Sequence, residues 1–169
     1  MWRTLVATGL LYGALGCPAY PAQTNDTSAN DEDFVEFAGE TDLTLARLGG
    51  MAESRASDPR IKQFGHMVQR DHVQDLQGLT AVANKIGAIA PNSLDDEHKQ
   101  VLSRFAGLNG QDFDRKFLKE MSDRHANAIS AYKREADRGF NAALKAYAGK
   151  DLPHLEAHLQ RAEQLAGGK

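Results

Sequence analysis

Residues 57–76, SDPRIKQFGHMVQRDHVQDL, contain a helix start followed by one apolar helical face. Ser57 and Asp58 offer side-chain oxygens for a cap, and Pro59 suits the first turn of a helix, where its missing N–H costs nothing. Apolar side chains then recur every three or four residues, at Ile61, Phe64, Val68, Leu76, Leu79, Val82 and Ile86. This spacing predicts a long helix that ends near Gly87.

The same spacing recurs on both sides of this helix and predicts an all-α fold. Further helices are predicted over residues 31–56, 93–108, 112–137 and 140–165. Gly110 and Gly139 separate the later helices, and Pro153 predicts a kink in the last one. Four long helices and one short connecting helix bury their apolar faces most simply in an antiparallel four-helix bundle, which we place at residues 31–166.

Composition favours one helical domain and argues against several functions. A chain of 169 residues that is 41% hydrophobic can bury a core without disulfides or metals to hold it together. A net charge of −3 does not favour the clustered basic surface of nucleic-acid-binding proteins, so no nucleic-acid partner is expected. The sequence also has no Gly-rich phosphate loop and no Ser/His/Asp signature. It therefore favours a protein without enzymatic activity.

Residues 1–16 have the features of a secretory signal peptide. The single charge at Arg3 precedes an apolar run that is too short, and too often interrupted by glycine, to span a membrane comfortably. Small residues follow, so we expect cleavage after residue 16 or as late as residue 22. Residues 17–30 are rich in Pro, Ser, Thr, Asn and Gln, which predicts a flexible tether. The mature protein is therefore expected in the periplasm or at the periphery of the outer membrane.

The only cysteine, Cys17, directly follows the predicted signal peptide and leaves two interpretations open. In the first, Cys17 becomes the lipidated first residue of a lipoprotein, and its lipid is the protein's contact with a membrane. Bacterial lipoproteins usually carry Leu three residues before that cysteine, where this chain has Ala14. In the second, an ordinary peptidase cleaves at Gly16, Ala19 or Ala22. A single cysteine cannot form an intramolecular disulfide in either case.

Histidines fall on or near the inner faces of three predicted helices. His72 and His125 each lie four residues after one apolar residue and four before another, and His158 lies on the apolar face of the last helix, one turn after His154. His72, His125 and His154 also fall near the midpoints of helices about 40 Å long, and midpoints tend to share one level in such a bundle. We therefore predict a central polar layer in which His72, His125, His154 and His158 bind a metal ion such as Fe, Zn, Cu or Mn.

Aspartates close to these histidines in sequence are expected to orient the rings by accepting their outer N–H groups. These candidate partners are Asp71, Asp75, Asp123 and Asp151. A second arrangement remains open, in which His154 and His158, four residues apart, chelate one ion from a single helix face.

A third interpretation needs no metal, because an inward histidine in a bundle is often a hydrogen-bonded core residue. Dimetal centres of the ferritin type need Glu-x-x-His pairs, and the nearest match here is Asp151-Leu152-Pro153-His154. The inward positions of the first helix offer Thr41 and Leu45, which are poor ligands. Ring nitrogens about 4 Å apart or less would favour the metal site, given metal–nitrogen bonds of about 2 Å.

Several short motifs, taken in order, resemble a family of exported bacterial proteins of unknown function, often labelled predicted outer membrane proteins and grouped with ferritin-like folds. The resemblance covers about Asp31 to Ala166. It rests on Asp33-Phe34-Val35, Leu48-Gly49, Asp58-Pro59, Phe64, Met67-Val68, Asp71-His72, Phe113-Asp114, His125, Leu152-Pro153, Leu155 and His158-Leu159.

The resemblance implies a ferritin-like four-helix bundle in the bacterial envelope, with His72, His125 and His158 as the characteristic histidines. Members commonly carry Glu where this chain has Leu45, and often an Asp-His pair where it has Arg124-His125. Three functions follow as hypotheses: a non-enzymatic envelope protein that binds a protein partner or small ligand or serves in stress tolerance; a metal-binding ferritin relative; and a lipoprotein anchored by Cys17. The sequence predicts no oligomeric state.

Overall fold

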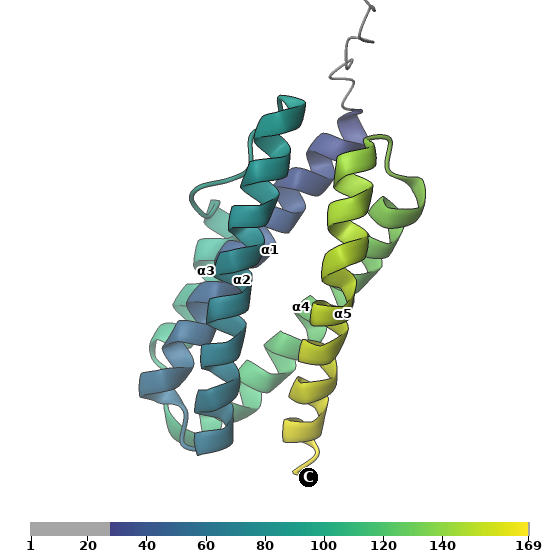
Figure 1. The fold of residues 1–169 in the computed structure, drawn as a ribbon. Coiled ribbons are helices and arrows are strands. Elements are labelled where there is room, and N and C mark those ends of the chain that lie inside the picture. The colour runs from purple at the N-terminus through teal and green to yellow at the C-terminus, as the bar shows by residue number, and fades with distance from the viewer. Residues whose placement is uncertain (1–27, 169) are drawn as a thin grey trace, which may run out of the picture.

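The computed structural model describes residues 28–168 and contains helices joined by loops, with no strands, over that range (Figure 1). Its five helices are α1 (Ala29–Arg55), α2 (Pro59–Ile86), α3 (Asp96–Ala106), α4 (Gly110–Arg138) and α5 (Ala142–Ala166). The predicted all-α fold with four long helices and one short connector is confirmed. The predicted signal peptide, Cys17 and most of the predicted tether lie outside the described residues, and α1 already includes the last two tether positions.

Polar side chains fix where the helices begin. Ser28 forms a capping box with Asp31, and Asp58 caps α2, with Pro59 in the first turn as expected. The short helix α3 starts later than predicted, because Asp95 rather than Ser93 accepts the free backbone N–H, that of His98. Gly110, expected to end one helix, instead begins α4 with a positive φ of 61°.

The long helices form two antiparallel hairpins packed face to face. Helix α1 packs against α2, and α4 packs against α5; across the bundle, α1 faces α4 and α2 faces α5. The start of α1 meets the loop after α4, and the start of α4 meets the loop after α1, so these helices are also antiparallel. Helix α3 connects the two hairpins in sequence. It packs against α1 and carries the chain back along the bundle from the end of α2 to the start of α4. One long crossover of this kind occurs in ferritin-like bundles, and membership of that superfamily stays a prediction.

Two apolar clusters fill the two ends of the bundle. One contains Leu45, Leu48, Phe64, Val68, Phe113, Phe117, Met121 and Ala162 among others. The other contains Phe34, Ala38, Leu79, Ala128, Tyr132, Leu144, Tyr147 and Leu155 among others. On each long helix the buried residues of the two clusters are separated by about two to three turns. This interval carries a buried polar residue on every long helix: Asp42, His72, His125 and His158.

Glycines allow α1 and α2 to approach closely beside this polar layer. A Cβ atom on Gly49 would lie 2.6 Å from the backbone oxygen of Gly65, which is too close for any side chain. The backbones of α1 and α2 are therefore in contact at these two glycines. Within residues 28–168, none of the helices is both long enough and apolar enough to cross a membrane.

Candidate metal centre

Three imidazole rings meet at the centre of the bundle, one from each of α2, α4 and α5. His72 and His125 are completely buried, and His158 is 2% exposed. The Nε2 atom of His125 lies 3.3 Å from Nε2 of His72 and 3.3 Å from Nδ1 of His158. One nitrogen from each ring thus lies within 4.8 Å of the other two, which is close enough to share an ion. We call these residues the histidine triad.

The outer nitrogen of each ring has a hydrogen-bond partner. His125 Nδ1 lies 2.7 Å from the backbone oxygen of Met121, which can only accept, so this nitrogen carries the proton and Nε2 has a free lone pair. His158 Nε2 lies 3.1 Å from Asp71 Oδ2. Desolvation opposes ionisation of Asp71, but hydrogen bonds from Arg70 and His158 outweigh it and lower its pKa. The ionised Asp71 therefore accepts, and Nδ1 of His158 has a free lone pair as well.

The third ring has two hydrogen-bonding options. His72 Nδ1 lies 2.8 Å from Asp42 Oδ1, and burial raises the pKa of Asp42 well above its usual value. If Asp42 is ionised, His72 donates to it and all three inner nitrogens carry lone pairs. If Asp42 is protonated, His72 Nε2 can donate to His125, but His158 Nδ1 still faces a nitrogen that offers it no proton. In both states, two lone pairs point at each other across 3.3 Å.

Burial keeps the triad uncharged at neutral pH. Desolvation lowers the pKa of His72 and of His158 to about 4. Desolvation, reinforced by the two neighbouring imidazoles, lowers the pKa of His125 well below its usual value. Neutral imidazole is the form that binds metal ions, so the rings do not need to lose a proton from a cationic state before they bind.

A second polar cluster borders the triad between α2 and α5. A carboxylate oxygen of Asp75, one of Asp151 and a ring nitrogen of His154 all lie within 4.8 Å of one another. Burial raises the pKa of Asp151, and burial together with Asp42 and Asp151 raises the pKa of Asp75 to about 7. Asp42 connects the two clusters, because it binds His72 and lies within the same distance of Asp75.

Most of the histidines and aspartates predicted from the sequence lie near the bundle centre, but in two groups rather than one. His72, His125 and His158 form the triad, and Asp71 is the partner of His158, as expected. His154 is exposed and groups with Asp75 and Asp151, and its chelation of one ion together with His158 stays a prediction.

One predicted partner lies elsewhere, and one partner was not predicted. Asp123 is on the outer surface of α4, where it forms an ion pair with Lys119, because its position points away from the apolar face. Asp42, which holds His72, was overlooked in favour of Thr41 and Leu45. Its position between Ala38 and Leu45 on the apolar face of α1 is the signal that would have identified it.

The fold is similar to that of two kinds of solved structure. CopM in the Cu(II)-bound form matches with a TM-score of 0.68 and 17% identity, over 82% of this chain and 96% of CopM. CopM in the Cu(I)-bound form also gives 0.68, with 18% identity and the same coverage. A DUF305 fragment from Deinococcus radiodurans gives 0.72 with 13% identity, over 85% of this chain and 99% of the fragment. At these identities the similarity concerns the fold alone.

No curated protein sequence matches this chain significantly. A family described as Domain of unknown function (DUF4142) matches residues 17–165, which include all five helices and both polar clusters except for the last residue of α5. The resemblance to a family of unknown function is thereby confirmed, whereas the export, ferritin-like grouping and outer-membrane label of that family stay predictions. The chain belongs to the DUF4142 family.

Proposed function

We propose that this protein is an exported metal-binding protein whose histidine triad holds one copper ion. The observation that carries the proposal is the convergence of His72 Nε2, His125 Nε2 and His158 Nδ1 with no proton available to join all three. Lone pairs that face one another repel, and a buried acceptor without a donor costs free energy. A cation at the centre of the three nitrogens converts this repulsion into three bonds.

The spacing of the nitrogens fits a small transition-metal ion. Ligands held at about 2.0–2.1 Å in a tetrahedral arrangement lie about 3.3 Å from one another. The two nitrogen–nitrogen distances at His125 are both 3.3 Å. The triad therefore needs little rearrangement to bind.

The partners of the triad are those that metal-binding histidines normally have. Asp42, Asp71 and the carbonyl of Met121 each take the outer N–H of one ring, which fixes its orientation and makes its inner nitrogen a better ligand. The ionised Asp71 also supplies negative charge beside the position of the cation. A buried cation is tolerated only where such charge is present.

Copper is the metal that best fits these ligands. Imidazole nitrogen suits Zn, Cu, Fe and Ni, and copper binds most tightly among the divalent first-row ions at a given site. The two copper-bound CopM structures, and a third in an Ag-bound form, share this fold and support the choice of metal. The triad itself supplies nitrogen ligands only, a set that differs from the Glu-rich dimetal centres of ferritin-type proteins.

Burial of the three rings is also what a core without metal would show. A core histidine of that kind, however, has donors and acceptors paired around both nitrogens. His158 Nδ1 has no donor in either protonation state of Asp42. The pairing of the inner nitrogens, rather than their burial, therefore distinguishes the two interpretations and favours a metal.

Copper titration of the triad tests the proposal. The protein, purified without a histidine tag, is titrated with Cu(I) in competition with a coloured chelator. We expect one tightly bound equivalent and an affinity at least about 100-fold lower in His125→Leu, since losing even an outer partner of a ligand typically costs 10–100-fold. Leucine continues the apolar core on both sides of position 125, so this variant should fold, which circular dichroism checks.

A matched control replaces a histidine outside the triad. His66 lies on the same helix as His72 but is 54% exposed, facing Glu53. The variant His66→Ala should bind copper as tightly as the unmodified protein. If folded His125→Leu binds copper like His66→Ala, the triad is not the copper site and the proposal fails.

Export and anchoring are the second part of the proposal. They rest on the apolar segment after Arg3 and on Cys17, which lie outside the described residues. Intact mass of the mature protein tests both. A mass that begins at Cys17 with added acyl chains supports the lipoprotein, a mass that begins between residues 17 and 23 without them supports simple export, and an uncleaved chain contradicts export.

A further inference from the structure

An open groove runs between α2 and α5, the two helices labelled in the foreground of Figure 1. Its volume is about 860 Å³, and its polar lining includes Asp71, Asp75, Asp151 and His154. Asp71 is already engaged with Arg70 and His158. The other three residues are not among the hydrogen-bond partners of the triad in the described part of the chain. They bring two carboxylates and one imidazole together at the groove.

The geometry of these three residues is that of a ligand set. Each offers one atom, and the three atoms lie within 4.8 Å of one another. They come from two facing helices, with Asp75 on α2 and Asp151 and His154 on α5, so a cation would join the two hairpins of the bundle. His154 is exposed and Asp75 partly so, which gives an ion direct access from solvent.

An unpaired buried oxygen marks the inner side of this set. Asp151 is only 4% exposed, yet its Oδ2 atom has no hydrogen-bond partner within residues 28–168. Asp42, which lies next to Asp75 and interacts electrostatically with Asp151, is 1% exposed, and its Oδ2 atom is likewise unpaired among the described residues. Buried carboxylate oxygens are normally satisfied, and two orphans close together indicate that a partner completes the site.

We propose that Asp75, Asp151 and His154 form a second metal site, separate from the histidine triad, that binds a divalent cation preferring oxygen ligands. Two carboxylates and one imidazole suit Mn²⁺ better than they suit copper, which favours the all-nitrogen triad. Water from the groove completes the coordination of the ion. The third carboxyl group, Asp42, lies next to Asp75 and stays hydrogen-bonded to His72.

The two neighbouring sites would bind different metals, because the ligand atoms of one are nitrogens and those of the other are mainly oxygens. The triad is buried and rich in nitrogen, whereas the groove site is accessible and rich in oxygen. Because the ligand sets share no residue, each site can be removed without touching the ligands of the other. The second site therefore does not depend on copper binding by the triad.

Manganese titration tests the groove site. Mn²⁺ is added to metal-free protein, and the sharp electron paramagnetic resonance signal of the aqueous ion is followed, because this signal broadens when the ion is bound. We expect about one bound equivalent, with affinity at least about tenfold lower in both Asp151→Asn and His154→Ala. Asp151→Asn keeps the shape of the side chain, so the fold should be preserved.

Two control variants make the result specific. Asp123→Asn removes an exposed aspartate that is paired with Lys119 and should leave Mn²⁺ binding unchanged. His125→Leu should lose copper but keep manganese, which separates failure of this site from failure of the triad. The inference is overturned if the unmodified protein leaves the aqueous signal intact, or if Asp151→Asn and His154→Ala both bind manganese as Asp123→Asn does.

Discussion

Buried aspartates occupy two kinds of position in this bundle, and their carboxylates differ in how fully they are hydrogen-bonded. Asp31 and Asp114 lie at opposite ends of the molecule, and their carboxylates accept several hydrogen bonds from other segments. Asp42 and Asp151 lie in the middle, and each keeps one oxygen without any partner within the described residues. All four are less than 9% exposed, so burial alone does not separate them.

The aspartates at the ends connect one hairpin to the other. Asp31, at the start of α1, accepts from the backbone N–H groups of Phe140 and Asn141, each at 2.9 Å, in the loop after α4. Asp114, at the start of α4, accepts from Ser57 and Asp58, each at 3.1 Å, in the loop after α1. The first helix of each hairpin thus supplies the acceptor for the loop of the other hairpin.

Hydrogen-bond satisfaction thus separates the carboxylates at the ends of the bundle from Asp42 and Asp151 in the middle, which we propose lie at a ligand site. A carboxylate with charge-assisted bonds to backbone N–H groups contributes to stability. A buried carboxylate with a free oxygen costs stability, and it persists where a ligand uses that oxygen. Stability measurements on the two kinds of aspartate should therefore give opposite results.

The largest effect is expected for Asp114→Ala. The change removes the acceptor for two backbone N–H groups and for the hydroxyl of Ser57, and leaves them partly buried without a partner. The free energy of unfolding, measured by urea denaturation, should fall by about 3 kcal/mol. Asp123→Ala, which breaks only an exposed ion pair with Lys119, should cost about 0.5 kcal/mol or less. Equal losses in the two variants would refute the structural role of Asp114.

These end connections illustrate what the sequence could not predict. The residues that Asp114 joins are 56 and 57 positions away, and those that Asp31 joins are 109 and 110 positions away. Local spacing predicts which face of a helix is buried, and it predicted the number and type of helices correctly. It contains no information about which loop a buried carboxylate will reach in the folded bundle.

The members of the triad were likewise only partly predictable from local spacing in the sequence. Apolar spacing placed His72, His125 and His158 on inner faces, where the structure has them. The argument from helix midpoints added His154, but a residue one turn away differs in height by only about 6 Å. The face of the helix, rather than the height, therefore determines which ring enters the triad. Asp42 was missed because an aspartate on an apolar face is counted as an interruption until its partner is known.

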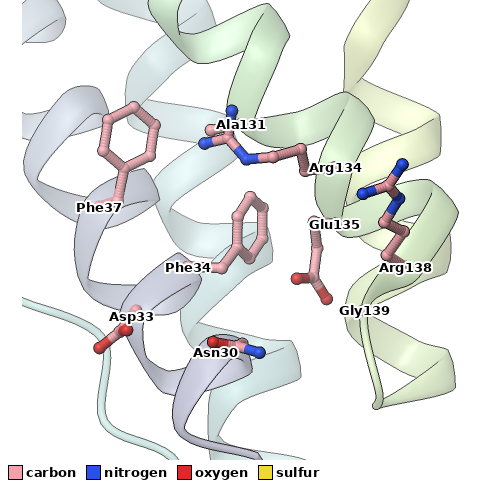
Figure 2. Close-up of a pocket in the computed structure, with 9 residues that line it drawn as sticks. All are labelled: Asn30, Asp33, Phe34, Phe37, Ala131, Arg134, Glu135, Arg138 and Gly139. Atoms are coloured by element: carbon pink, nitrogen blue, oxygen red, sulfur yellow. The ribbon is translucent and has the colours of Figure 1, made fainter.

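A medium effect that depends on pH is expected for Glu135→Gln. Glu135 is an exception at the Asp31 end, because it is 5% exposed and its Oε1 atom has no hydrogen-bond partner among residues 28–168. Figure 2 shows its side chain between Phe34 and Arg138. Burial, helped by the charge of Asp31, raises the pKa of Glu135 from 4.5 to about 7. The folded state therefore holds this proton more tightly than the unfolded state does.

The sign of the pH dependence follows from that difference. The stability contributed by the bound proton is complete below pH 4.5 and is lost as the pH rises through about 7. Glu135→Gln removes the titration, so the variant should be more stable than the unmodified protein by about 1–2 kcal/mol at pH 8 and similar to it at pH 4.5. Thermal unfolding across this range measures the difference. Glu156→Gln, at an exposed ion pair with Lys133, serves as the control and should show no such trend.

The smallest effect on the metal-free protein is expected for Asp151→Asn, which is the direct counterpart of Asp114→Ala in the middle of the bundle. Burial raises the pKa of Asp151, so its charge opposes folding, and the neutral amide removes that charge without changing the shape of the side chain. The free energy of unfolding should stay within about 0.5 kcal/mol of the unmodified value, or rise above it. With Mn²⁺ present, the unmodified protein should gain more stability than the variant, since a ligand that binds the folded state raises the unfolding free energy in proportion to how tightly it binds. A loss comparable to that of Asp114→Ala in metal-free protein would instead make Asp151 a structural residue like those at the ends.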